Sequence, residues 1–357
     1  MDYLCISGCE SRDHVPLSFP PLLRVCSLTR LEMMGLHILH IPAEIGCLTS
    51  LIFLNLSRND FKILPDSIKH LSKLQFLGLS YCRKLESLFE DISCLISLRI
   101  LDLRGNDFKV LPASIKHLPK LEEFHISYCR RLESLSGLPS SLWHFVAHDC
   151  SSLGTISSDM KFVHQIVGGK YIFSNCLKQK EDMSVKVQTA AKSLFQTASP
   201  YFLNGVVMCL PGRNIPDWFT GRGTGASVTL QLPTGLRDNN SIGLALCISV
   251  AFTDYSPKLG LTIHGDFRLE SREDYFHEKE AWDFDLKPFE RESMQAPADV
   301  QTRFLRSDHI FLCSRNLYVE ECNNHKTVTV TFHLLDGADM PLECCRVEKC
   351  AYYVLPS

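Results

Sequence analysis

The sequence predicts an α/β leucine-rich-repeat solenoid followed by an all-β sandwich with a short helical lead-in. The first observation is internal repetition: Phe61–Leu71 resembles Phe108–Leu118, 47 positions later, and Ser80–Leu88 resembles Ser127–Leu135 in the same way. This block contains a finer period of leucines with the L-x-x-L-x-L-x-x-N-x-L spacing of a leucine-rich repeat. The second observation is that this period gives way, toward the C-terminus, to short strand-like runs separated by Gly, Pro and Asn turns.

Length, composition and charge indicate a soluble chain with room for two domains. The chain has 357 residues, of which 45% are hydrophobic and 22% charged, and a formal net charge of -3. This charge gives no general attraction for nucleic acid or anionic membranes, so neither is an expected partner. The longest uncharged apolar run, 242–252, is too short to span a bilayer. Without a secretory signal, we expect a cytoplasmic or nuclear protein whose 16 cysteines stay reduced.

About seven repeats are predicted over residues 1–158. Positions within a repeat are numbered here from its first leucine. An initial unit beginning at Met1 fits the same spacing, and no polar capping segment precedes it, so we expect the array to continue upstream in a longer parent chain. The later repeats start at Leu28, Leu51, Leu74, Leu98, Leu121 and Leu142.

Each repeat is predicted to contain one short strand and one convex segment. Apolar side chains at positions four and six, such as Leu101 and Leu103, should point inward, and neighbouring strands should pair in parallel. Position nine is Asn or Cys, and the amides of Asn59 and Asn106 can satisfy backbone groups left open where the strand turns. A proline after that turn, such as Pro112, limits the convex side to a short helical turn.

Residues 159–357 are predicted to form one C-terminal domain. Apolar residues at helical spacing between Glu181 and Ala198 predict an amphipathic helix. The charged stretch from Leu269 to Arg306 is predicted to be a long surface loop. Seven short strands separated by turn residues predict a sandwich. These strands are 205–210, 226–232, 242–252, 259–267, 309–312, 327–335 and 347–355.

One segment of the C-terminal domain resembles a known family. It is a Pro-Gly-x-x-Ile-Pro-x-Trp-Phe run made by Pro211, Gly212, Ile215, Pro216, Trp218 and Phe219. With Gly225–Pro233 and Ile242–Cys247, it is similar to the C-terminal jelly-roll and immunoglobulin-like domain of plant immune receptors. In those receptors a Toll/interleukin-1-receptor-type (TIR) domain and a nucleotide-binding domain precede leucine-rich repeats. The repeats also resemble that family, in their alternation of Asn-type and Cys-type units.

The resemblance implies a jelly-roll or immunoglobulin-like sandwich and a function in plant defence. By this resemblance the chain is a non-catalytic recognition region of an intracellular immune receptor, which binds a pathogen effector protein and regulates the upstream TIR and nucleotide-binding domains. Residues resembling those two domains are not in this sequence, so the family's NAD-cleaving activity cannot come from it. Two alternatives stay open: a repeat adaptor that scaffolds host proteins, and an enzyme or glycan-binding jelly roll.

No segment predicts catalysis, a cofactor or a metal site. The glycine-rich Gly221–Gly225 is followed by a strand-like run instead of the helix N-terminus that phosphate binding needs, so a turn is predicted. No nucleophile elbow surrounds any Ser, and no C-x-x-C pair occurs. We therefore expect a chain without enzymatic activity.

The candidate partner-binding residues point outward from the repeat strands. We define the concave face as the side chains at positions three, five and eight of the repeats. Aromatic and Arg residues on an open surface are typical of binding hot spots, but the apolar row could equally pack under the C-terminal domain. Glu123 and His144 continue this row, and Trp218 with Phe219 is expected to close the sandwich edge. The candidates on the concave face are Phe53, Asn55, Arg58, Phe76, Tyr81, Ile100, Asp102, His125 and Tyr128.

Overall fold

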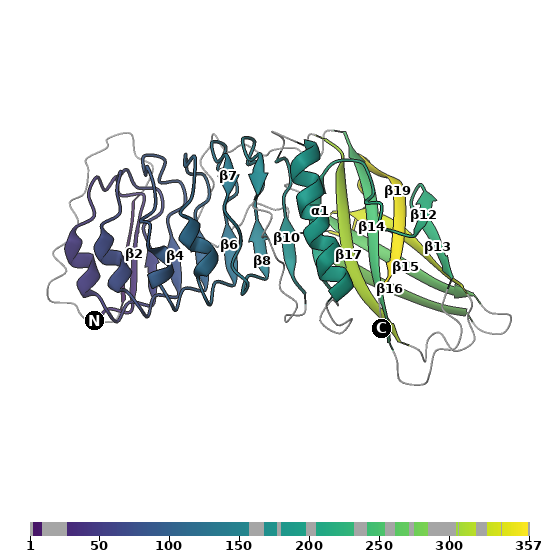
Figure 1. Ribbon diagram of the computed structural model, residues 1–357, viewed down its shortest axis with the longest axis horizontal. Helices are drawn as coiled ribbons and strands as arrows, with labels where there is room; N and C mark the ends of the chain where they lie inside the picture. The colour runs from purple at the N-terminus through teal and green to yellow at the C-terminus, as the bar shows by residue number, and fades with distance from the viewer. Residues whose placement is uncertain are drawn as a thin grey trace. The chain divides into compact units, whose positions relative to one another are not determined.

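The computed structural model describes residues 3–8, 27–156, 168–176, 180–197, 205–231, 241–253, 261–270, 275–284, 305, 307–318, 327–336 and 338–355. The chain divides into two units (Figure 1). The repeat unit comprises Met1–Val163 and Cys176–Ala190, and the sandwich unit comprises His164–Asn175 and Ala191–Ser357. The predicted boundary between residues 158 and 159 stays a prediction.

A parallel sheet runs through the repeat unit, with one strand from each repeat. The strands are β1 (Tyr3–Ser7), β2 (Arg30–Met34), β3 (Phe53–Asn55), β4 (Phe76–Gly78), β5 (Ile100–Asp102), β6 (Glu123–His125) and β8 (His144–Val146), and their order in space follows the chain. A separate parallel pair is formed by β7 (Ser134–Leu135) and β9 (Thr155–Ile156). The predicted parallel pairing is therefore confirmed.

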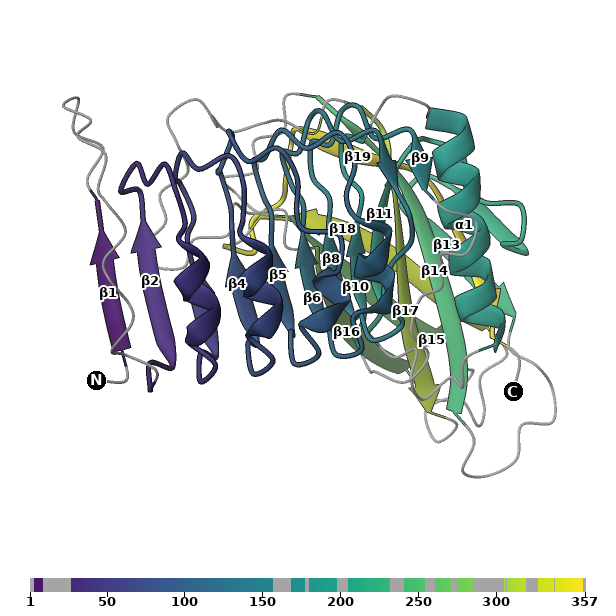
Figure 2. The ribbon, with the colours of Figure 1, turned by 60° about the vertical axis from the view of Figure 1, so that its left-hand side comes forward.

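Short 3-10 helices line the side of the solenoid opposite the sheet (Figure 2). They are η1 (Ala43–Cys47), η2 (Asp66–His70), η3 (Ile92–Cys94) and η4 (Ala113–His117). Three of them follow a proline in extended or near-extended conformation: Pro42, Pro65 and Pro112. Proline has no amide hydrogen and a fixed φ, so it starts such a turn without losing a hydrogen bond.

The core of the repeat unit consists of the side chains at positions four and six. Leu54, Leu56, Leu101 and Leu103 have no exposed surface, and the same is true of the equivalent residues in the other repeats from Leu31 to Ala147. Alternate side chains of a strand lie on opposite faces, so the residues between them are directed away from this core. The predicted repeat register is confirmed.

Position nine carries the predicted ladder. The Asn59 amide nitrogen donates to the carbonyls of Met33 (2.6 Å) and Leu56 (2.9 Å). The Asn106 amide nitrogen donates to those of Leu79 (2.9 Å) and Leu103 (2.7 Å). Cysteines at this position donate a single S–H instead, to Leu56 from Cys82, to Leu103 from Cys129 and to Ile126 from Cys150. Each side chain thus satisfies backbone carbonyls that the turning strand leaves unpaired.

The pattern of positions four, six and nine occurs once more after residue 156, where the sequence predicts that the period stops. Tyr171, Phe173 and Cys176 are buried, and the Cys176 thiol donates to the carbonyl of Ala147 at 2.9 Å. Aromatic residues stand at positions four and six of this segment in place of leucines, and this hides the period in the sequence.

The sandwich unit has two sheets, as predicted. In the first, β11 (Val207–Pro211), β17 (His309–Tyr318), β14 (Ser241–Phe252), β19 (Cys345–Val354) and β12 (Gly221–Thr224) pair antiparallel in that order, and β10 (Lys170–Ile172) pairs parallel with β11. The second has the order β13 (Ser227–Gln231), β18 (Thr327–Leu335), β15 (Thr262–Glu270) and β16 (Tyr275–Asp283). The helix α1 (Lys180–Thr197) also agrees with its prediction and buries Val187, Ala191, Leu194 and Phe195.

Two strands lie where the sequence predicts a loop or a turn. β16 falls in the predicted loop, whose residues 285–304 lie outside the described part of the chain. Its Trp282 is 2% exposed, while Glu278 and Glu280 form ion pairs with the buried Arg315 of β17. These acidic residues hide the alternation of a strand. β12 replaces most of the predicted glycine turn, because Gly221 leaves room for the Tyr352 ring of β19, which a Cβ would approach to 1.9 Å.

Candidate functional site

Strand register aligns position three of successive repeats into one row on the concave face. Phe53 lies opposite Phe76, Phe76 opposite Ile100, Ile100 opposite Glu123 and Glu123 opposite His144. The rings of Phe53 and Phe76 are stacked, with centroids 4.1 Å apart and planes 3° apart. These apolar side chains are half-buried, less exposed than the sequence predicts, because each covers part of its neighbour.

An arginine that sequence reasoning did not select extends this row toward the N-terminus. The Arg30 guanidinium lies over the Phe53 ring, 3.7 Å from its centroid, and its Nε donates to Glu32 at 2.6 Å. A guanidinium stacked on an aromatic face is attracted by the ring's electron density. Arg30 could have been found as position three of the repeat that starts at Leu28.

Position eight adopts left-handed backbone in every repeat from Leu28 onward. The φ angles are 64° at Gly35, 60° at Arg58, 57° at Tyr81, 69° at Gly105, 65° at Tyr128, 56° at Asp149 and 57° at Asn175. In the central repeats the position-eight amide donates to a carbonyl of the next repeat, as Tyr81 does to Arg104 (2.6 Å) and Tyr128 to His148 (2.7 Å). The turn is therefore fixed by contacts between repeats.

Two tyrosines occupy this strained backbone, and both rings lie against neighbouring repeats. A Cβ at Gly105 would come within 2.2 Å of the Tyr81 ring, so glycine is needed where that ring packs. The Tyr128 ring meets His148 edge-on, with centroids 5.3 Å apart. Both tyrosines are half-buried, and burial raises the pKa of Tyr81. Arg58, the third candidate at this position, is also half-buried.

Candidates at position five lie deeper than the sequence predicts. The exposed fractions are 2% for Asn55, 3% for Asp102 and 7% for His125. The Asn55 carbonyl oxygen accepts from the Ser57 hydroxyl at 2.7 Å. Their assignment as partner contacts stays a prediction, and in this structure they support the face from beneath its surface.

Asp102 forms a two-pronged ion pair with Arg104. The Arg104 Nε and Nη2 atoms donate to the two carboxylate oxygens at 2.9 and 2.7 Å. Burial by itself raises the pKa of Asp102, but the guanidinium outweighs burial and holds that pKa below its ordinary value. The pair therefore stays ionised and largely cancels its own charge.

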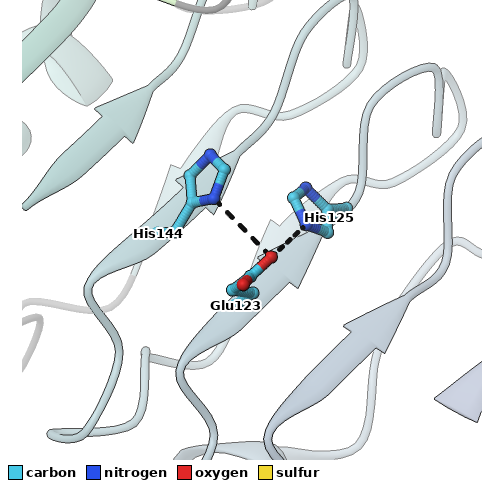
Figure 3. A group of neighbouring side chains, drawn as sticks. All are labelled: Glu123, His125 and His144. Carbon is cyan, nitrogen blue, oxygen red and sulfur yellow. Dashed lines mark hydrogen bonds and ion pairs between the residues drawn. The ribbon is translucent and has the colours of Figure 1, made fainter. Parts of the chain in front are cut away.

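A histidine and carboxylate cluster lies where β6 meets β8 (Figure 3). The Glu123 Oε2 atom is 3.4 Å from His125 Nε2 and 3.8 Å from His144 Nδ1. Hydrogen bonds from the two histidines lower the pKa of Glu123, whereas burial lowers the pKa of His125. The sequence places Glu123 and His144 in the concave row but does not reveal that His125 joins them.

The Pro-Gly-x-x-Ile-Pro-x-Trp-Phe motif is built into the sandwich. Gly212 follows β11 with a φ of 134° and donates its amide to the carbonyl of Asp308. Ile215, Pro216 and Phe219 are buried with Pro211, whereas Trp218 is half-buried. The Trp218 ring stacks on Phe219 (4.1 Å) and packs against Phe195 of α1 (5.8 Å) and Tyr353 of β19 (5.4 Å). This packing supports the structural role that the sequence predicts for the two aromatic residues.

Within the described residues, no helix is long and apolar enough to cross a bilayer.

All thirteen described cysteines are free thiols. Burial raises the pKa of Cys82 and Cys129 to about 12, so both are protonated donors at neutral pH.

Comparison with known proteins gives matches across both units. Residues 210–349 match the model of the C-JID domain, and residues 50–71 and 97–118 match the Leucine Rich Repeat model. A solved leucine-rich repeat domain, that of the type III effector XopL, is 24% identical, covers 52% of this chain and 73% of its own, and has a TM-score of 0.39.

Curated relatives from Arabidopsis thaliana align with most of the chain. Disease resistance-like protein DSC1 is 30% identical over 96% of this chain and 26% of its own length. Disease resistance protein RPP2B is 30% identical over 60% of this chain and 19% of its own. Disease resistance protein RPS4B is 28% identical over 87% of this chain and 22% of its own. The chain therefore spans 26% or less of the length of these relatives.

Proposed function

We propose that this chain binds a partner protein through its concave face. The chain is homologous to the C-terminal leucine-rich-repeat and C-JID region of plant disease resistance proteins of the TIR and nucleotide-binding type. The proposed partner is a pathogen effector protein inside the plant cell. Binding would regulate TIR and nucleotide-binding domains of the parent receptor. The chain itself acts in this proposal as a non-catalytic recognition region.

The observation that carries this proposal is the pair of tyrosines at position eight. Left-handed backbone costs an ordinary residue about 1–2 kcal/mol, and the same position holds Gly35 and Gly105 in other repeats. Tyr81 and Tyr128 adopt this left-handed conformation in spite of its energetic cost, and their rings are half-buried at the surface. Strained residues of this kind concentrate at binding sites, and Tyr is enriched among interface hot spots.

The stacked row at position three supports the same face. Arg30, Phe53 and Phe76 form a continuous stack, and strand pairing holds their backbones in place. A preorganised surface loses little side-chain freedom when a partner binds. Aromatic residues with Arg on a rigid sheet thus offer an anchor for a partner protein.

The test is partner binding with paired variants. We would screen the purified chain against a panel of purified pathogen effectors, then measure the Kd of any binder for Phe76→Glu and Tyr128→Glu. Each substitution is expected to weaken binding by about 2 kcal/mol or more, about 30-fold, with little change in the melting temperature. Ile63→Glu is the matched control, since Ile63 is 70% exposed outside the concave face, and its Kd should equal that of the parent chain.

Each other outcome identifies a different role. Unchanged affinity at unchanged stability in both variants would refute binding through this face and direct attention to the sandwich loops. Earlier melting of both variants would mean that these rings serve packing. Binding only to host proteins, with no effector bound, would favour the alternative of a repeat adaptor that scaffolds them.

A further inference from the structure

We infer that Glu123, His125 and His144 form a binding site for a divalent transition-metal ion of the Zn²⁺ type. The three donor atoms, one from each side chain, lie within 4.8 Å of one another (Figure 3). Two imidazoles and one carboxylate are a donor set that Zn²⁺ and neighbouring metals prefer. The inference does not depend on the proposed partner, because the site lies within a single chain.

The backbone brings these residues together without any flexible segment. Glu123 and His125 are two residues apart on β6, so their side chains leave the same face of the strand. His144 lies on β8 directly opposite Glu123 in the parallel register. Sheet pairing therefore fixes all three Cα positions, and only side-chain rotation remains to close the site.

Two of the spacings between donor atoms are close to those of metal coordination. Metal bonds of 2.0–2.1 Å in a tetrahedron place ligand atoms about 3.3–3.4 Å apart. The Glu123 oxygen is 3.4 Å from one imidazole nitrogen and 3.8 Å from the other. The carboxylate oxygen is therefore close enough to both imidazole nitrogens to share one ion with them, in place of its long hydrogen bond to His125.

The surroundings also suit a cation with an open coordination position. The side chains of His125 and His144 are 9% and 10% exposed, while that of Glu123 is 25% exposed, so the site opens to solvent at its carboxylate. Arg104, a half-buried cation that follows the adjoining strand β5, is neutralised by its ion pair with Asp102. Three protein ligands leave a fourth position for water or for a donor atom from another molecule.

The His144 ring is also oriented by its environment. The Trp143 ring stacks on it at 5.6 Å, and the His125 ring meets it edge-on at 5.1 Å. The Nδ1 atom of His144 faces Glu123, and its buried Nε2 atom has no hydrogen-bond partner among the described residues. Such packing fixes a ligand in place before the ion arrives.

The experiment is titration of the purified full chain with ZnCl2 by calorimetry, after iodoacetamide has blocked the exposed thiols of Cys5, Cys47 and Cys94. We expect one ion per chain and a higher melting temperature with Zn²⁺. Glu123→Gln and His144→Gln should each weaken binding at least about tenfold. His148→Gln is the matched control, a histidine that is 7% exposed near the same strands but outside the cluster, and should bind Zn²⁺ as the parent chain does.

A spectroscopic measurement on the unsubstituted chain keeps the inference testable if a variant fails to fold. Co²⁺ in the site should give the visible absorption of low-symmetry nitrogen and oxygen coordination, without the sulfur-to-cobalt charge-transfer band of thiolate ligands. Absence of binding to the unsubstituted chain would overturn the inference. So would a thiolate band, or equal affinity in Glu123→Gln, His144→Gln and the parent chain.

Discussion

Replacing the two position-nine asparagines should destabilise the protein by different amounts. Asn59 donates to the carbonyls of Met33 and Leu56, makes a longer contact of 3.5 Å with that of Ser57, and accepts from the amides of Leu36 and Ile38, each at 3.1 Å. In Asn59→Ala, the Leu56 carbonyl keeps the thiol of Cys82 and the Ser57 carbonyl keeps the amide of Gly35. The Met33 carbonyl and the amides of Leu36 and Ile38 lose their Asn59 partner. A buried polar group left without a partner costs about 1–3 kcal/mol. The half-buried Leu36 amide can recover water, so the other two groups give an expected loss of about 2–6 kcal/mol.

Asn106→Ala should cost less, about 1–3 kcal/mol. The Leu103 carbonyl keeps the Cys129 thiol at 3.2 Å, so only the carbonyl of Leu79 loses its Asn106 partner. Urea unfolding followed by circular dichroism measures both free energies of unfolding, provided that the denaturant slopes agree. Asn106→Cys is the control, because a thiol at this position donates one hydrogen bond in neighbouring repeats and should restore part of the loss. Equal costs for Asn59→Ala and Asn106→Ala would refute this reasoning.

Two further predictions test the core and the charges. Leu101→Asp places an unpaired charge at a side chain with no exposed surface, so it should cost several kcal/mol and abolish cooperative thermal unfolding, and an unchanged melting curve would contradict the repeat register. Partial burial alone would raise the pKa of Asp60, but His37 (2.8 Å) and Lys84 (3.1 Å) outweigh burial and lower it. Because the folded pKa lies below the unfolded value, the stabilisation is present above about pH 4 and is lost as the pH falls through the folded pKa. Asp60→Asn should thus lower the free energy of unfolding by up to about 1 kcal/mol at pH 7 and by less at pH 2, measured by urea unfolding. A loss independent of pH would contradict the ion pairs.

The leucine period is the part of the fold that the sequence predicted most fully. The side chains at positions four and six, the amide ladder of Asn59 and Asn106, and the convex turn after Pro112 all follow from spacing within one repeat. Each depends on residues close in the chain, and a repeat that recurs many times makes its own register evident. The resemblance carried by the Trp218 and Phe219 motif likewise predicted the sandwich.

The structure was needed wherever a residue's role depends on a distant strand. The acidic residues of β16 indicate a loop until Arg315 of β17 is seen to pair with them. The burial of Asn55, the left-handed backbone at Tyr81 and the stack of Arg30 on Phe53 depend on how neighbouring repeats cover one another.

The cluster of Glu123, His125 and His144 divides in the same way between sequence and structure. The sequence alone determined that Glu123 and His144 share position three of adjacent repeats, because that follows from the leucine period. Only the tertiary structure decided that three donor atoms come within 4.8 Å, because that distance depends on the parallel register of β6 with β8 and on the side-chain directions. The spacing of residues in the sequence determines the face of the sheet on which a side chain lies. The packing of neighbouring strands determines which other side chains contact that side chain.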